Sequence, residues 1–151
     1  MIRIATRANI ELYDGWKLDN GITNWRKGAV LYHHWDSYPS WMGPRLEDLL
    51  TQVKKALDQA GYPYWWDSGR VGALIVKLSA DEDELKKGVP AFQPCFELHG
   101  DIEYLWRVYL GPEDGEYDIQ CFAVCFDWDK DTIKRLEKVD WRKEIEREQR
   151  R

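Results

Sequence analysis

The chain has 151 residues and a formal net charge of −5, and 44% of its residues are hydrophobic and 32% charged. These values are typical of one globular domain spanning residues 1–151, and the acidic balance argues against broad binding to nucleic acid. No segment approaches the roughly 18 consecutive apolar residues of a membrane span. Because the N-terminal residues lack a charged-then-apolar signal pattern, we expect a cytoplasmic protein.

The most unusual feature of the composition is its aromatic content, with nine tryptophans and eight tyrosines. Such residues either fill a core or line a pocket or interface. The three cysteines form no Cys-x-x-Cys pair. Cys121 and Cys125 lie about 13 Å apart in an expected strand, which exceeds the reach of a disulfide. We therefore expect buried thiols rather than a structural zinc site.

The first half of the chain predicts two strands followed by a helix. Residues 2–12 alternate between apolar and polar side chains, as in a half-buried strand. Two turn signals, Asp14-Gly15 and Asn20-Gly21, lead to a second strand over about residues 28–35. Leucine and valine at helical spacing then predict a helix from about residue 44 to residue 60, ended by Gly61.

The segment 67–79 combines helical apolar spacing with a β-branched run, so it fits either a helix or a buried strand, and we favour a helix. Residues 102–110 and 117–126 predict two strands joined by a tight turn. A charged helix is expected over about residues 131–147, with a frayed tail to residue 151 and with an inner stripe of Ile133, Leu136 and Val139.

The expected order is therefore ββααββα. Paired strands with helices between the pairs favour an α+β fold, in which an antiparallel sheet of about four strands has helices mainly on one face.

The stretch 31–43, LYHHWDSYPSWMG, holds two of the three histidines. Successive residues of a strand point to opposite faces, so His33 and His34 cannot serve one site while the strand stays regular. His34 shares a face with Asp36, whereas His33 is expected to pack. Asp36 either orients His34 or caps the Tyr-Pro turn.

Several segments together resemble an uncharacterised family found in bacteria, archaea and phages. The resemblance covers most of residues 2–126 and is carried by RIATRANIEL, VLYHHWDSYPSWMG, WWDSGRVGALIVKL and HGDIEYLWRVYL. This family has no established activity, so the resemblance implies a set of residues and no reaction. Ser37 replaces a glycine of the family motif and would be strained if that position has a positive φ. The matching residues are Thr6, Arg7, His34, Trp35, Asp36, Tyr38, Pro39, Gly43, Gly100, Asp101, Ile102, Glu103 and Tyr104.

Two groups of residues are candidates for chemistry. His34, Asp36 and Glu103 are the candidate catalytic residues, since an imidazole with carboxylates can move protons. Glu103 needs a partner within its apolar strand: Arg107 on the same face is the structural alternative, and Arg7 or His34 across the sheet is the functional one. The candidate ligand-binding residues are Arg7, Trp35, Tyr38, Asp101 and Tyr104.

Two functions are compatible with these residues. The first is a small binding or regulatory module with an aromatic-rimmed polar pocket near His34–Pro39, for a small anionic ligand or a protein partner. The alternative is a small hydrolytic or metal-assisted enzyme that uses His34 with Asp36 or Glu103, and Arg7 for an anionic group. No ligand spacing is diagnostic of a metal, and no cofactor is indicated. An open cleft lined together by Arg7, His34, Asp36 and Glu103 would favour the enzyme or a ligand site, whereas pairing among these residues with no cavity beside them would argue against both.

Overall fold

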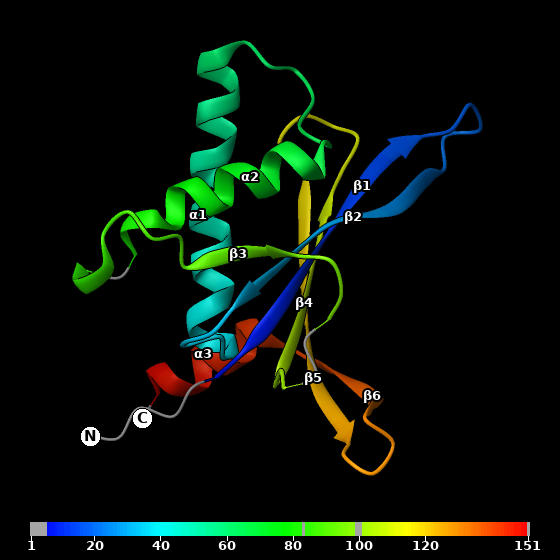
Figure 1. Cartoon of the computed structure of the whole chain (residues 1–151). Coiled ribbons are helices and arrows are strands. Elements are labelled where there is room, and N and C mark those ends of the chain that lie inside the picture. Colours follow the sequence, from blue (N-terminus) through cyan, green and yellow to red (C-terminus); the bar gives the residue numbers. More distant parts are fainter. Residues whose placement is uncertain (1–5, 83, 99–100, 151) are drawn as a thin grey trace.

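The computed structural model describes residues 6–82, 84–98 and 101–150. The described residues form six strands, three α-helices and two 3₁₀ turns, and Figure 1 labels the strands and α-helices. In chain order these are β1 (Ala8–Lys17), β2 (Thr23–His33), α1 (Pro39–Ala60), α2 (Ser68–Leu78), η1 (Ser79–Asp81), η2 (Glu84–Lys86), β3 (Phe92–Cys95), β4 (Tyr104–Leu110), β5 (Tyr117–Asp127), β6 (Thr132–Val139) and α3 (Trp141–Gln149).

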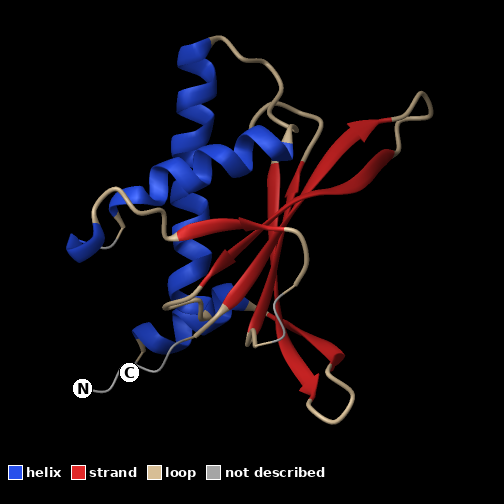
Figure 2. Ribbon diagram, viewed as in Figure 1, coloured by secondary structure: helices blue, strands red, loops and turns tan. Residues whose placement is uncertain are grey.

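The strands form one mixed sheet in the order β3-β2-β1-β4-β5-β6. Neighbouring strands are antiparallel except for the central β1–β4 pair, which is parallel. The helices lie on one side of the sheet, and the β1–β2 and β5–β6 hairpins project beyond it (Figures 1 and 2). The predicted α+β class with helices on one face is confirmed. The predicted antiparallel sheet of four strands is wrong in both strand number and direction.

The main core lies between this sheet and the helices. Even-numbered residues of β1 and β4 face the helices, and α1 presents its leucine stripe to them. The largest fully buried side chains of this core are Trp106, Phe92, Ile10, Leu12, Leu31, Met42, Leu46, Leu49, Leu50, Ile75 and Leu110.

The opposite face of the sheet carries a smaller set of buried side chains, namely Val30, Tyr32 and Leu105, which lie outside the main cluster. Glu11 is also buried on this face. Its carboxylate accepts a hydrogen bond from Arg107 Nε at 3.0 Å and lies 3.4 Å from Lys27 Nζ. Two cations thus compensate the buried carboxylate, as a charge removed from water requires. Arg107 is therefore the partner of Glu11 and not, as one alternative had it, of Glu103.

Local signals account well for the first two helices. Helix α1 begins at Pro39, five residues earlier than expected, with Pro44 one turn inside it. It ends at Gly61, whose φ of 67° closes the helix in the left-handed region. The segment 67–79 is a helix, as favoured, because the Asp67 side chain accepts a hydrogen bond from the Arg70 backbone N–H and caps it.

The largest departure from prediction is at the C-terminus, where residues 132–139 form strand β6 and the helix begins only at Trp141. The three apolar residues of this segment fit a helical stripe, but they pair against β5 instead. Asp127 Oδ1 accepts hydrogen bonds from the backbone N–H groups of Asp129 and Lys130, and this turn brings the chain back. Pairing satisfies the backbone groups of β5, which a helix would leave unpaired.

The N-terminal hairpin is longer than predicted. β1 runs through Asp14-Gly15 to Lys17, and the reversal occurs at residues 18–22, where Gly21 has a φ of 82°. β2 therefore begins at Thr23 rather than near residue 28. The short edge strand β3 was not predicted, since its Phe-Gln-Pro-Cys sequence contains a proline. Residues 2–5 of the first expected strand lie outside the described residues.

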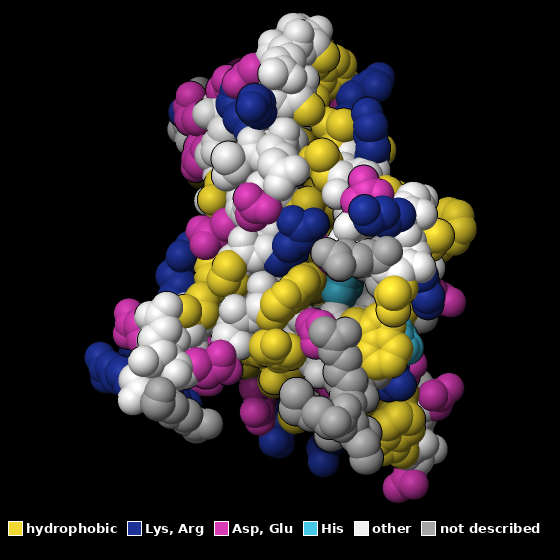
Figure 3. Space-filling model, turned by 90° about the vertical axis from the view of Figure 1, so that its left-hand side faces the viewer, with side chains coloured by type: hydrophobic (Ala, Val, Ile, Leu, Met, Phe, Trp, Pro, Cys, Tyr) yellow, Lys and Arg dark blue, Asp and Glu magenta, His cyan; other side chains and the backbone are white. Residues whose placement is uncertain are grey.

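The surface over the helical side mixes acidic and basic side chains, with apolar side chains showing between them (Figure 3). Among the described residues, no helix combines the length and the apolar character needed to cross a membrane.

A close approach between α1 and α3 yields a prediction about stability. A Cβ atom added at Gly43 would overlap the ring of Trp141, which is buried and donates its Nε1–H to Ile119 O at 3.0 Å. Since this ring has no room to move, Gly43→Ala should lower the free energy of unfolding by about 1–3 kcal/mol, as measured by urea denaturation.

Gly69→Ala, in the first turn of α2, is the matched control. The atom nearest to its added Cβ is Asp67 Oδ1 at 3.4 Å, an ordinary contact. This substitution should leave the free energy of unfolding unchanged or raise it by up to about 1 kcal/mol. Equal effects of the two substitutions would contradict the described packing of α1 on α3.

Candidate functional site

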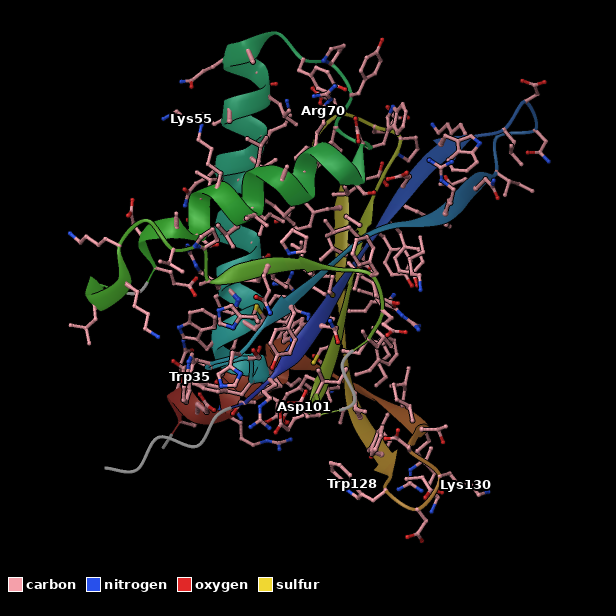
Figure 4. All side chains as sticks on the ribbon, viewed as in Figure 1. Trp35, Lys55, Arg70, Asp101, Trp128 and Lys130 are labelled. Carbon is pink, nitrogen blue, oxygen red and sulfur yellow. The ribbon has the colours of Figure 1, made fainter. Side chains whose placement is uncertain are left out.

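The candidate residues converge at one end of the sheet. Parallel strands begin at the same edge, so the residues before β1 and β4 are neighbours, and antiparallel β2 ends there. Arg7 O accepts hydrogen bonds from the backbone N–H groups of Glu103 at 2.9 Å and Tyr104 at 3.3 Å. The backbone N–H of Ser37 donates to Thr6 O at 3.1 Å. In Figure 4, Trp35 and Asp101 both lie toward this end, which we call the β1 edge.

Arg7 pairs with two carboxylates at the β1 edge. Its guanidinium Nη1 lies 3.7 Å from Glu103 Oε1, and its Nε lies 3.5 Å from Asp101 Oδ2. The backbone N–H of Arg7 also donates to Glu103 Oε2 at 2.6 Å. Of the three partners considered for Glu103, namely Arg107, Arg7 and His34, the structure places Arg7 in contact with it. These side chains are partly exposed, so each ion pair contributes at most about 1 kcal/mol.

His34 lies beside the same group, with its Nδ1 3.1 Å from the hydroxyl of Tyr32 and its ring packed edge-on against Trp35 at 4.6 Å. Burial raises the pKa of Tyr32, and the negative charge of Asp101 adds to that rise. The Tyr32 phenol therefore stays protonated at neutral pH. A neutral hydroxyl next to an imidazole can relay a proton or simply orient the ring.

The turn after His34 differs from expectation in one respect. Asp36, not Ser37, adopts the positive φ, at 54°. Aspartate tolerates this left-handed conformation better than most residues do. Ser37 is fully buried, and its hydroxyl donates to His33 O at 3.2 Å. The serine that replaces the glycine of the resembling family is thus accommodated without strain.

His33 faces the helices, as strand parity predicts, and belongs to a polar network that the sequence did not reveal. Its ring lies 4.5 Å from that of Phe92 and 5.3 Å from that of Trp41. Its Nε2 is 2.7 Å from Glu82 Oε2, and Arg45 Nε donates to the other oxygen of Glu82 at 2.8 Å. Glu82 lies 49 residues from His33 along the chain, so no local signal links them.

The pKa of Glu82 reflects opposing effects. Burial, the largest of them, raises it, but hydrogen bonds from His33 and Arg45 with their charges outweigh burial and hold the pKa below its ordinary value. The carboxylate therefore stays ionised and joins the 3₁₀ segment to β2 and α1.

A pocket of about 380 Å³ opens next to the β1 edge, on the side of the helices. It brings together two predicted ligand-binding residues, Tyr38 and Tyr104. The other predicted site residues do not line it. Its lining consists of Tyr38, Pro39 and Ser40 at the start of α1, Tyr104 in β4, Ala123 in β5, Val139 in β6, and Glu144 and Glu148 in α3.

Tyr104 forms one wall of this pocket. Burial raises the pKa of its phenol, and the negative charges of nearby groups, including Glu144, add to the rise. Tyr38 precedes α1 and is 38% exposed, and its side chain makes no capping hydrogen bond. The pocket thus presents aromatic rings and carboxylates to the same space. The two glutamates were not predicted, because residues 131–139 were expected to belong to the same helix.

Among the described residues, no group of three or more histidine, cysteine, aspartate or glutamate side chains is arranged to hold a metal ion.

No protein-family model, curated protein or solved structure matches the chain. The resemblance to the uncharacterised prokaryotic and phage family therefore stays a prediction.

The Glu82 network predicts a pH-dependent loss of stability. At pH 7, Glu82→Gln removes the negative charge that compensates Arg45 and one carboxylate contact with His33. It should therefore lower the free energy of unfolding by about 1–3 kcal/mol. Because the folded-state pKa lies below the ordinary 4.5, this contribution is present above pH 4.5 and is lost as the pH falls through the folded-state value. Urea denaturation at several pH values measures the difference between the two proteins.

Asp101→Asn serves as the control, since it removes an exposed carboxylate that also lies beside an arginine. Its effect should stay within about 0.5 kcal/mol at pH 7. A Glu82→Gln protein as stable as the wild type at pH 7 would show that the network contributes nothing.

Proposed function

We propose that the protein is a small binding module whose ligand enters the pocket between Tyr38 and Tyr104. The observation that carries the proposal is this pocket, whose volume of about 380 Å³ falls within the range of small-molecule sites. Aromatic and apolar walls supply contact area, and a few polar groups supply orientation. This combination is typical of ligand sites and supports an aromatic-rimmed polar pocket near His34–Pro39.

The β1 edge extends the proposed binding surface beyond the pocket. Trp35 is 44% exposed and, with Tyr38, flanks the turn that leads into α1. Exposed aromatic side chains of this kind are common anchors at interfaces. A partner that inserts one group into the pocket would therefore also meet Trp35 and the Arg7–Asp101–Glu103 group. We further infer a cytoplasmic setting, with which the three free thiols are compatible.

The second candidate is a small hydrolytic or metal-assisted enzyme that uses His34. The contact between Tyr32 and His34 at the β1 edge favours it, because an imidazole beside a hydroxyl suits proton transfer. Arg7 would bind an anionic group in that enzyme. Its guanidinium already faces Asp101 and Glu103, so an anion would have to compete with two carboxylates. This competition makes the binding module the better supported function.

The proposal is tested by screening for ligands of the pocket. A set of small amines, carboxylates and neutral aromatic compounds is added singly to the ¹⁵N-labelled protein, and amide shifts are followed by NMR. We expect at least one compound to shift amides of residues 38–40 and 104. Tyr38→Ala, which removes one wall, should weaken that binding about tenfold, since a stacked aromatic contributes about 1 kcal/mol or more.

Tyr64→Ala is the matched control, because Tyr64 is similarly exposed but lies in the α1–α2 connection, away from the pocket. It should leave binding unchanged. A complete absence of shifts at the pocket would refute the module, and chemical conversion of a bound compound that depends on His34 would favour the enzyme.

A further inference from the structure

The charged side chains that line the Tyr38–Tyr104 pocket are all of one sign. Of its eight lining residues, two are glutamates and none is lysine or arginine. An anion entering this space would meet two carboxylates with no compensating cation in the lining. The electrostatics therefore favour a positively charged ligand over the anionic one expected from Arg7.

The two glutamates belong to one helix face. Glu144 and Glu148 are four residues apart in α3, so their side chains are neighbours, and like charges at this spacing repel each other. Glu144 has a nearby cation in Arg147, at 3.3 Å. Within the described part of the chain, Glu148 takes part in no ion pair. A cation bound between the two carboxylates would relieve their repulsion.

The remaining walls favour an organic cation over a metal ion. Tyr38 and Tyr104 line the pocket, and the faces of tyrosine rings attract ammonium and guanidinium groups. Pro39, Ala123 and Val139 add apolar surface that suits an aliphatic chain. A hydrated inorganic cation would gain little from contact with these aromatic and apolar walls, since it prefers oxygen ligands and water.

We propose that this pocket binds an organic cation, in which an ammonium or guanidinium group lies near Glu144 and Glu148 while its aliphatic chain contacts the two tyrosines. The inference rests on the proposed binding function and names its ligand class. A lysine or arginine side chain of a partner protein and a free polyamine share this chemistry.

The test compares charged probes of matched size on the full-length protein. Spermidine, the peptide Gly-Gly-Lys-Gly-Gly, and the same peptide with glutamate or glutamine in place of lysine are titrated at low salt and followed by ¹⁵N NMR. We expect the two cations to shift amides of residues 38–40, 104 and 144–148, and the acidic peptide to leave them unchanged. The tighter binder of the two cations identifies the source of the natural ligand.

Three substitutions locate the charge. Glu148→Gln should weaken binding of the cations about threefold, as the loss of one exposed ion pair predicts, and the Glu144→Gln/Glu148→Gln double variant should weaken it about tenfold. Glu146→Gln is the matched control, since it removes the same charge from α3 at a position outside the pocket lining. It should weaken binding by less than about 1.5-fold.

The outcomes separate this inference from the function on which it rests. Binding of neutral or acidic compounds in preference to the cations, still dependent on Tyr38, would overturn the organic cation and leave the binding module standing. Equal weakening by Glu146→Gln and Glu148→Gln would overturn it as well, because the attraction would then be due to overall charge. If no compound of any charge shifts the pocket, both proposals fail.

Discussion

The parallel pairing of β1 with β4 is the constraint on which the rest of the structure depends. Its register sets Ala8 opposite Tyr104, so the residues just before the two strands, Arg7 and Glu103, must be neighbours. β2, antiparallel to β1, returns its last residues to the same end. One backbone arrangement thus gathers the starts of β1 and β4, the end of β2 and the turn into α1. The side chains there lie close together although about 100 residues separate them in sequence.

Two carboxylates, Glu11 and Glu82, show how the fold compensates negative charge on the two faces of the sheet. On the open face, Glu11 is compensated by Arg107 and Lys27. On the helical face, Glu82 is compensated by Arg45 and contacts His33. Each is held by partners from distant segments, so these contacts specify which elements are neighbours as well as contributing stability. At the β1 edge, Arg7 faces the carboxylates of Asp101 and Glu103.

The sequence predicted the parts of the fold that have local causes. The leucine spacing of α1, the Asp67 cap of α2 and the alternation of β4 are each decided within one segment. The parallel β1–β4 pair is not, because no local pattern distinguishes a parallel neighbour from an antiparallel one at the centre of a sheet. β6 was missed for a related reason: Ile133, Leu136 and Val139 fit a helical stripe, and only the unpaired edge of β5 makes a strand the better solution.

Prediction of the candidate site divides in the same way. Glu103 was expected to need a partner, with Arg107, Arg7 and His34 as the alternatives, and its contact with Arg7 is present. The expectation that His33 and His34 point to opposite faces followed from the alternation of side chains along a strand alone. Sequence reasoning missed Glu144 and Glu148 as pocket residues, because their positions depend on where α3 begins.

The position of α3 in turn depends on the close contact between Gly43 of α1 and Trp141 of α3. Gly43 leaves room for the indole of Trp141, which is held by its hydrogen bond to Ile119 O and packs against Trp106 at 6.1 Å. Trp141 is the first residue of α3, so its packing fixes where the helix begins. From this position, Glu144 and Glu148 line the same pocket as Tyr38 and Tyr104. The aromatic walls of the pocket thus come from the start of α1 and from β4, and the two carboxylates that favour a cation come from α3.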